Sequence, residues 1–200
     1  MKKSQSKRKA EVVRETRETQ IRLKLTLDGR GISRIQTPIP FINHMLELMS
    51  HHGSLDLDLK AQGDIEVGFH HTVEDLGICL GEAFKKCWGD FRGIRRYGSS
   101  LLPMDESLVM TVVDISQRPH LSYGWKPRKV RLEGFDTALV KEFFQALVNR
   151  AGLTLHLRVL EGENIHHIIE AIFKSFGRAI AEASQIQTGL RTVRSTKGIL

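Results

Sequence analysis

The sequence predicts an α+β fold made of two similar halves, each combining strands with two helices. A rare string, His-His-x-x-Glu, occurs twice in the chain, at residues 70–74 and 166–170. The residues after the two strings stay in register, so that Gly81 recurs as Gly177 at an offset of 96. A constant offset of this kind indicates an internal duplication. We therefore expect two layered halves that pack together and meet near residues 93–100.

In the first half, the apolar residues predict a strand, a helix, a second strand and a long helix. Residues 18–29 alternate apolar and polar side chains and end on an Asp-Gly turn signal. Residues 40–53 carry apolar side chains at helical spacing, and alternation returns in the string LDLDL at 55–59. The first His-His pair then opens a long helix over residues 70–86.

The second half repeats this succession of elements. Strand-like alternation covers residues 106–116 and 153–157, while helical spacing covers 139–152 and 166–182. Each half thus has an amphipathic sheet and helices to cover it, which is the pattern of an α+β protein. The predicted parts are a basic flexible tail at residues 1–10, a first half at 11–92 and a second half at 93–190.

The chain is basic, with 30 Lys and Arg against 23 Asp and Glu and a formal net charge of +7. Such an excess suits nucleic acid, an acidic membrane surface or a phosphorylated small molecule. Aromatic residues make up only 6% and do not alternate with the cations, which argues against a nucleic-acid stacking surface. The sequence has no run of 18 apolar residues and no apolar segment behind its basic start. We therefore expect no membrane span and no secretory signal, and a cytoplasmic location.

The two histidine strings predict metal sites. On a helix, a glutamate three and four residues after two histidines lies one turn from both, so we expect all three side chains to point to one patch. Imidazole and carboxylate groups are ligands for borderline divalent metals, and the absence of thiolate ligands argues against a structural zinc site. The six side chains are His70, His71, Glu74, His166, His167 and Glu170.

Two further side chains could join them. His44 and Glu142 occupy the same place in the two halves, thirteen residues before the middle of each LDLDL-like strand. With them the chain could supply eight ligands, enough for two metals with open positions. The alternative is that each string is a solvated helix surface with an (i, i+4) His–Glu contact, but two copies in register favour the metal site.

A set of ordered motifs extends from about residue 8 to the last residue. The motifs are RETRET (14–19), FINHML (41–46), GD (63–64), HHTVEDLG (70–77), RRYG (95–98), PMDESL (103–108), RP (118–119), HHIIEAIFKSFGRA (166–179) and STKGIL (195–200). Together they resemble the imidazoleglycerol-phosphate dehydratase family of histidine biosynthesis. The resemblance implies a ribosomal protein S5 domain 2-like fold, in which each half has a four-stranded sheet and two helices. It also implies two Mn²⁺ ions per subunit and a cubic homo-oligomer of 24 subunits, with active sites between subunits.

The resemblance also assigns roles to individual residues. The implied metal ligands are His44, His70, His71, Glu74, His166, His167 and Glu170. Glu142 is implied as a further ligand, at a position where the family motif holds His or Glu. The implied phosphate-binding residues are Arg96, Arg118, Lys174, Ser195 and Lys197, the last two in a substrate-binding tail at residues 191–200. One departure concerns His44, because Asn43 stands where the family usually has an Asp that would orient this histidine.

The implied reaction is the removal of water from D-erythro-imidazole glycerol phosphate to give imidazole acetol phosphate, which makes the chain a hydro-lyase. The substrate C–H is not acidic, so we expect two metals to hold the ring as imidazolate, whose electrons expel the neighbouring hydroxyl. Glu18 is the implied acid/base group, across a subunit contact, with Glu170 or a metal-bound water as the next candidates. Glu11 and Glu15 are chemically equivalent neighbours of Glu18.

Two other classes of protein would use similar residues. A metal-dependent phosphoesterase or nuclease also needs His and Glu ligands with a basic rim, but it would release phosphate instead of forming a ketone. A metal-storing shell would bind many ions per chain without turnover.

Overall fold

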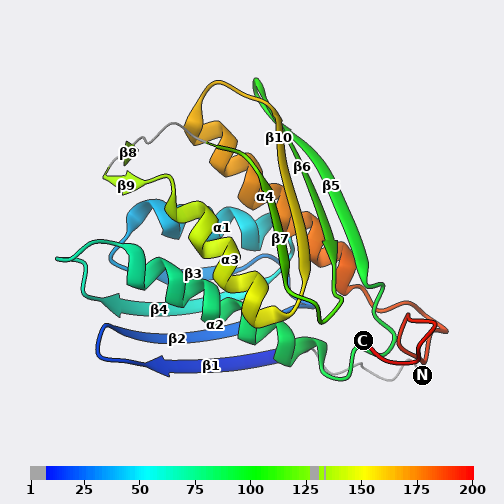
Figure 1. Ribbon diagram of the computed structural model, residues 1–200. Coiled ribbons are helices and arrows are strands. Elements are labelled where there is room, and N and C mark those ends of the chain that lie inside the picture. Colours follow the sequence, from blue (N-terminus) through cyan, green and yellow to red (C-terminus); the bar gives the residue numbers. More distant parts are fainter. Residues whose placement is uncertain (1–7, 127–130, 133) are drawn as a thin grey trace.

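Two four-stranded sheets, one from each half of the chain, lie on either side of four helices in the computed structural model (Figure 1). The structure describes residues 8–126, 131–132 and 134–200. The first sheet has the order β1 (Lys9–Glu15), β2 (Thr19–Thr26), β4 (Asp56–Gly63) and β3 (Ser33–Gln36). The second has the order β5 (Tyr97–Met104), β6 (Ser107–Asp114), β10 (Thr154–Glu161) and β7 (His120–Gly124).

The four helices and a small ribbon complete the fold. The helices are α1 (Pro40–His52), α2 (His70–Trp88), α3 (Leu139–Ala151) and α4 (Ile165–Ser184). The ribbon pairs β8 (Arg131–Leu132) with β9 (Phe135–Asp136). No helix in the described ranges is both long and apolar enough to cross a bilayer.

The two sheets have the same topology, which confirms the predicted α+β fold. In each sheet the first three strands are antiparallel and the fourth runs parallel to its neighbour. The predicted helices and the four predicted strands are present, with small shifts at their ends. The predicted tail at 1–10 lies outside the described residues up to residue 7, and β1 already starts at Lys9.

Four strands that periodicity does not predict lie at the sheet edges or are short. β1 buries only Val12, so its alternation is weak. β3 has four residues, and β5 contains Pro103, which an edge strand tolerates because one side of its backbone needs no ladder partner. β7 has no buried side chain at all. Edge strands expose more of their side chains to solvent, so their sequences show little alternation of apolar and polar residues.

The helices pair across the two halves, with α1 against α4 and α2 against α3. Glycines at the equivalent repeat positions make this packing close. A Cβ atom on Gly177 of α4 would collide with the Met49 carbonyl oxygen of α1. A Cβ atom on Gly81 of α2 would lie 2.5 Å from the Leu147 carbonyl oxygen of α3. The duplication therefore repeats the helix crossing as well as the sheet.

Phenylalanine rings fill the space where α2, α3 and α4 meet. Phe144 of α3 lies 5.1 Å from Phe173 and 5.2 Å from Phe176 between ring centroids, and both partners belong to α4. Phe84 of α2 meets Phe176 edge-on at 6.4 Å. These rings are fully buried, and aromatic pairs of this geometry stabilise a core beyond the area that they bury. They fix α4 relative to both halves of the chain.

The helix crossing gives a first prediction. Replacing Gly177 with Ala should lower the free energy of unfolding by about 1–2 kcal/mol, because the clash with Met49 outweighs the gain in helix propensity. Denaturant unfolding measures this change. Lys85→Ala, on the exposed face of α2, is the control and should stay within about 0.5 kcal/mol of the parent. An unchanged or higher stability of Gly177→Ala would show that the helices do not need this close approach.

Candidate metal and active site

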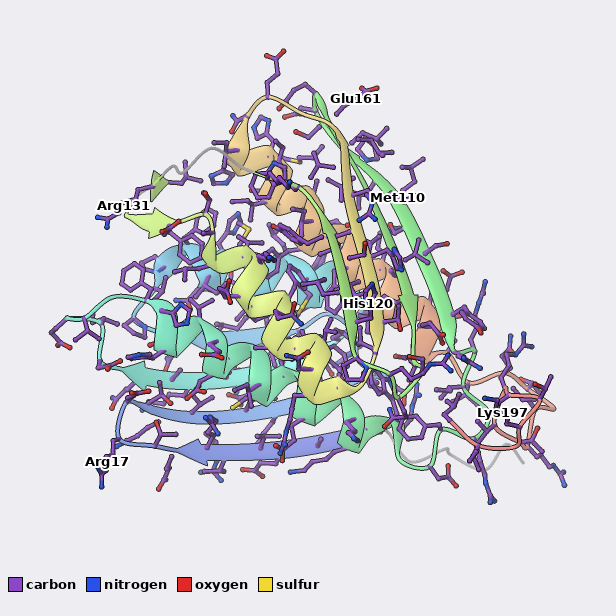
Figure 2. The ribbon with its side chains drawn as sticks, viewed as in Figure 1. Arg17, Met110, His120, Arg131, Glu161 and Lys197 are labelled. Carbon is purple, nitrogen blue, oxygen red and sulfur yellow. The ribbon has the colours of Figure 1, made fainter. Side chains whose placement is uncertain are left out.

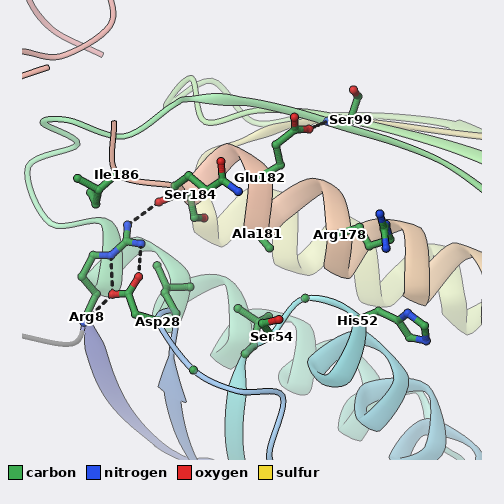
Figure 3. A pocket seen from close by; sticks show the side chains of 15 residues that line it. Arg8, Asp28, His52, Ser54, Ser99, Arg178, Ala181, Glu182, Ser184 and Ile186 are labelled. Atoms are coloured by element: carbon green, nitrogen blue, oxygen red, sulfur yellow. Dashed lines mark hydrogen bonds and ion pairs between the residues drawn. The ribbon is translucent and has the colours of Figure 1, made fainter. Parts of the chain in front are cut away.

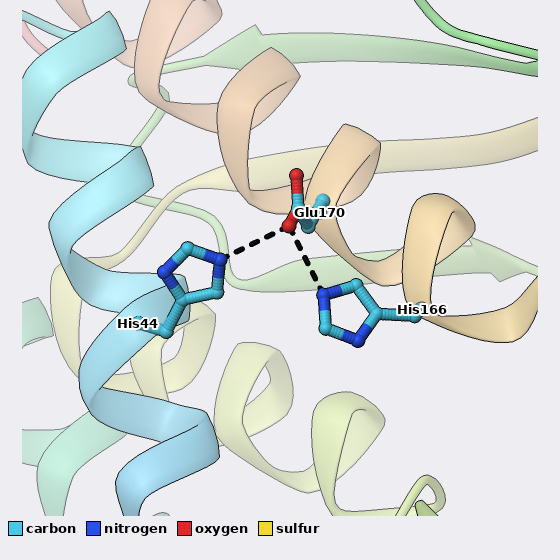
Figure 4. Close-up of side chains that lie close together, drawn as sticks. All are labelled: His44, His166 and Glu170. Carbon is cyan, nitrogen blue, oxygen red and sulfur yellow. Dashed lines mark hydrogen bonds and ion pairs between the residues drawn. The ribbon is translucent and has the colours of Figure 1, made fainter.

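Three predicted ligands from two helices and both halves of the chain converge on one point (Figure 4). The Glu170 Oε1 atom lies 3.0 Å from the His166 Nε2 atom one turn before it and 3.0 Å from the His44 Nε2 atom of α1. One ligand atom from each of the three lies within 4.8 Å of the others. The ring of Phe41 meets the His166 ring edge-on at 5.6 Å and so restrains its orientation. This cluster has the donors of a nitrogen and oxygen metal site.

Glu170 stays ionised at this point. It is 8% exposed, and burial raises its pKa, but hydrogen bonds from Lys174, His44 and His166 more than offset this, so the pKa falls to about 2. Lys174 Nζ lies 2.6 Å from the Glu170 Oε2 atom. A buried carboxylate that is negatively charged and close to two imidazoles suits a divalent cation.

Asn43 does not contact His44 through its side chain. Its Oδ1 atom accepts a hydrogen bond from the Thr37 hydroxyl at 2.7 Å, and its Nδ2 group donates to the Thr37 carbonyl at 3.2 Å. These bonds hold the chain that enters α1. The contact that orients His44 comes instead from Glu170.

The side-chain directions in the first half differ from those of the predicted triad, and the role of its members as ligands stays a prediction. His70 Nε2 lies 3.6 Å from Glu74 Oε2, as expected for an (i, i+4) pair. His71 instead places its Nδ1 atom 3.0 Å from Asp64 Oδ2, in the loop before α2. Consecutive residues point about 100° apart around a helix, so the two histidine rings approach the glutamate from different sides.

The second half departs from the prediction in the same way. His166 faces Glu170, whereas His167 places its Nδ1 atom 2.8 Å from Glu106 Oε2 in the β5–β6 turn. In each string, the first histidine therefore faces the glutamate of the same string, and the second histidine faces an acid from another part of the chain.

Glu142 lies outside the three-residue cluster of His44, His166 and Glu170. It is half-buried in the first turn of α3, the helix that packs on α2. This placement mirrors that of His44 on α1, which packs on α4. Its role as a ligand stays a prediction.

Glu18 lies in the turn between β1 and β2, close to the first histidine pair. Its Oε2 atom is 3.8 Å from His71 Nδ1, and its side chain is 54% exposed, so it can reach a molecule bound outside the chain. Glu11, one of its chemical equivalents, instead accepts from Arg22 at 2.8 Å. The structure therefore separates these two glutamates, one beside a histidine and one in a surface ion pair.

Four of the five predicted phosphate-binding residues line one cavity of about 910 Å³ at the C-terminal tail, where Figure 2 labels Lys197. They are Arg96, Arg118, Ser195 and Lys197. The fifth, Lys174, lies apart and contacts Glu170. The predicted set is therefore divided between two places on the chain.

Arg96 is held in this cavity by a partner that the sequence did not reveal. Its Nε and NH2 groups donate to the two carboxylate oxygens of Asp114 at 2.7 and 3.1 Å, and its NH1 group donates to the Arg194 carbonyl at 2.7 Å. The side chain is nearly buried. Paired donors to a carboxylate are among the strong hydrogen bonds of proteins, so Arg96 anchors the tail to the second sheet.

Comparison with known proteins identifies the family. The family model described as imidazoleglycerol-phosphate dehydratase matches residues 37–180. The imidazoleglycerol-phosphate dehydratase of Trichlorobacter lovleyi is 54% identical over 194 residues, which covers 97% of this chain and 100% of that protein. The chain belongs to the imidazoleglycerol-phosphate dehydratase family.

Solved structures of the imidazoleglycerol-phosphate dehydratase family have the same fold. The enzyme from Staphylococcus aureus superposes with a TM-score of 0.81 at 41% identity, covering 90% of this chain and 99% of that one. The enzyme from Pyrococcus furiosus superposes with a TM-score of 0.82 at 35% identity, covering 94% and 100%. The S5-like duplicated architecture expected from the sequence is therefore confirmed.

A second cavity, of about 780 Å³, contains none of the predicted site residues (Figure 3). Arg8 lies at one end of it, where it bonds Asp28 at 2.7 Å and the Ser184 carbonyl at 2.7 Å. Arg178 and His52 line the opposite wall. Through Arg8, the edge of the first sheet is tied to the end of α4.

The Arg96 contacts give a second prediction. Replacing Asp114 with Ala removes a charge-assisted pair of about 1.5–3 kcal/mol, so the tail should detach at least about tenfold more often. Limited trypsin digestion measures this, since Arg191, Arg194 and Lys197 are cleavage sites and cleavage follows the population of the open tail. Asp58→Ala, on an exposed strand position, is the control. Equal cleavage rates in the two variants would contradict the anchoring role.

Proposed function

We propose that the chain performs the dehydration of its family at sites assembled between copies of the chain, each site joining the metal cluster of one copy to the phosphate cavity of another. The observation that supports this is the division of the predicted substrate contacts. Lys174 lies at the metal cluster, and the other four residues lie at the tail.

The two places are too far apart to bind one substrate within a single chain. The backbone N–H of Arg96 donates to the carbonyl of Ala183 at 2.9 Å, near the end of α4. Ala183 follows Glu170 by thirteen residues, which is about 20 Å along the helix axis. The three-carbon chain between the ring and the phosphate of the substrate spans only about 5 Å. A ring at Glu170 therefore needs a phosphate cavity from a neighbouring copy.

Lys174 links the two contributions. It lies one turn beyond Glu170, and its Nζ atom lies 2.6 Å from the Glu170 Oε2 atom, so its ammonium group is at the metal cluster. Lys174 would meet the phosphate beside the metals, and Arg118, Ser195 and Lys197 of the neighbouring copy would close around it. Lysine, arginine and hydroxyl donors suit a phosphate monoester.

The donor set of the cluster fits Mn²⁺, with imidazole and carboxylate ligands and no thiolate. When bound, two Mn²⁺ ions would supply the Lewis acidity that holds the substrate ring as its anion. His44, His166 and Glu170 would hold one ion. The remaining metal ligands would be His70, Glu74 and Glu142. His71 and His167 would also bind metal, across the contact between two copies.

Glu18 would carry the proton of the reacting carbon. Its exposed carboxylate lies beside His71, so it would reach a substrate ring held near that histidine. Loss of the hydroxyl would leave an electron-poor ring that makes the adjacent C–H acidic, and a carboxylate within hydrogen-bond distance of that C–H is a suitable general base. Glu170 is less suited, because three donors already occupy it.

The same arrangement supports a closed homo-oligomer, and we propose the 24-subunit cubic form. Each copy offers one metal face and one phosphate cavity, so the contact that joins them is between unlike surfaces, and such contacts form a ring when the rotation between copies closes. We place the enzyme in the cytoplasm, since a charged phosphate ester does not cross a lipid bilayer unaided.

A mixing experiment tests whether the sites are shared. His44→Ala should abolish Mn²⁺-dependent formation of imidazole acetol phosphate, and Lys197→Ala should greatly reduce it at substrate concentrations below the raised KM of this variant. Co-expression of the two variants should restore a measurable fraction of the activity, because some contacts then pair an intact metal cluster with an intact cavity. The control is co-expression of His44→Ala with Glu170→Ala, which damage the same face and should stay inactive. Activity that does not return in the first pair would place the whole site in one chain.

Steady-state kinetics should separate binding from chemistry. Lys197→Ala should mainly raise KM, since a phosphate contact is present in both ground and transition states. Glu18→Gln should lower kcat by about 10²- to 10⁴-fold with KM little changed. Glu11→Gln, in the surface ion pair, is the matched control and should keep the parent kcat. A normal kcat in Glu18→Gln would move the acid/base role to Glu170.

A further inference from the structure

We infer that Asp64 and Glu106 are positioning residues that hold His71 and His167 in the tautomer whose Nε2 atom is free to bind metal. The inference rests on the proposed function, because it assumes that these two histidines are ligands. The sequence motifs GD and PMDE contain both acids, but their spacing gives them no role.

Asp64 holds His71 from the loop between β4 and α2. Its two carboxylate oxygens lie 3.0 and 3.2 Å from the His71 Nδ1 atom. An ionised carboxylate only accepts, so a neutral imidazole at this distance carries its proton on Nδ1. The Nε2 atom then has a free lone pair on the side of the ring away from the carboxylate. The negative charge of Asp64 also makes the imidazole a stronger base.

Glu106 does the same for His167 from the turn between β5 and β6. Its Oε2 atom lies 2.8 Å from His167 Nδ1. Its Oε1 atom accepts from the backbone N–H of Asn164 at 2.9 Å and from that of Glu163 at 3.3 Å. The carboxylate is therefore fixed to the segment that opens α4. Its orientation does not depend on the histidine alone.

The two acids are not repeat equivalents, although the two histidines are. Asp64 follows the third strand of its sheet, whereas Glu106 precedes the second strand of its own. The residue that directly precedes the second strand of the first sheet is Glu18, whose Oε2 atom lies 3.8 Å from His71 Nδ1. In the first half, Asp64 therefore supplies the closer carboxylate at 3.0 Å.

The first histidine of each string is arranged differently. His166 directs Nε2 at Glu170, and His70 directs Nε2 at Glu74, both within one chain. His71 and His167 direct Nδ1 at their carboxylates, which leaves Nε2 without a partner among the described residues. Ligands aimed out of the chain fit a metal that is shared with a neighbouring copy. The two carboxylates therefore prepare the histidines before the copies meet.

Asp64 has a second connection, to the proposed acid/base group. Its backbone N–H donates to the Glu18 carbonyl oxygen at 3.0 Å. One residue thus sets both the ring of His71 and the turn that carries Glu18.

Metal binding by the full-length assembled protein tests the inference. Asp64→Ala and Glu106→Ala should each weaken the affinity for one of two Mn²⁺ ions by about 10- to 100-fold, measured by equilibrium dialysis and elemental analysis. Asp64→Asn and Glu106→Gln keep an oxygen acceptor for Nδ1–H and should lose less. They also carry the test if an alanine variant does not fold. The controls are Glu66→Ala, an exposed acid in the loop of Asp64, and Glu163→Ala, an exposed acid in the loop before α4, which should bind Mn²⁺ like the parent.

A second readout follows the tautomer directly. Solid-state NMR of metal-free protein labelled with ¹⁵N-histidine should show one ring moving from Nδ1–H toward Nε2–H in each alanine variant. A merely structural role would change thermal stability and leave this signal in place. Unchanged affinity and tautomer in Asp64→Ala and Glu106→Ala, while His71→Ala and His167→Ala lose metal, would overturn the inference alone. Full Mn²⁺ binding by the two histidine variants would overturn the proposed function together with it.

Discussion

The close approach of α1 to α4 is the constraint on which the metal cluster depends. Gly177 lets the two backbones meet at Met49, and Glu170 lies two turns before that contact on α4. His44 lies five residues before Met49 on α1, so the crossing brings it within 3.0 Å of the Glu170 carboxylate. Any side chain at position 177 would push the helices apart and separate ligands that come from different halves. The sheets and the phenylalanine core hold the helices in place, but this glycine sets the distance.

Much of the fold follows from periodicity, because helices and central strands bury a regular face. β2 buries Ile21, Leu23 and Leu25 on one side, and this alternation is legible in the sequence. β1 and β7 bury almost no side chains, so no apolar alternation in the sequence predicts these strands. Their existence was expected from the family resemblance, not from the residues.

The candidate site could also be predicted in part, because the spacing of residues along a helix determines which side chains share a face. Helical spacing predicts that His166 faces Glu170, and the repeat singles out His44 as a candidate ligand. That His44 meets the second string instead of the first depends on which helices pack together, which spacing does not reveal. The direction of His71 and His167 depends on carboxylates in two loops, and loop conformation is set by contacts distant in sequence.

The crossed pairing of the helices has a consequence for how such a chain could change over time. Two identical half-chains related by a two-fold axis would also place the first helix of each on the last helix of the other. The two halves of the present chain are thus arranged like the members of a symmetric dimer, within one polypeptide. In a symmetric dimer, every substitution appears at both equivalent positions. When the halves belong to one chain, a substitution can occur in one half alone. The equivalent positions 44 and 142 hold different residues, His44 and Glu142, so they have diverged. An imidazole and a carboxylate differ in charge and in metal preference, so the two metal positions that we propose could differ in affinity.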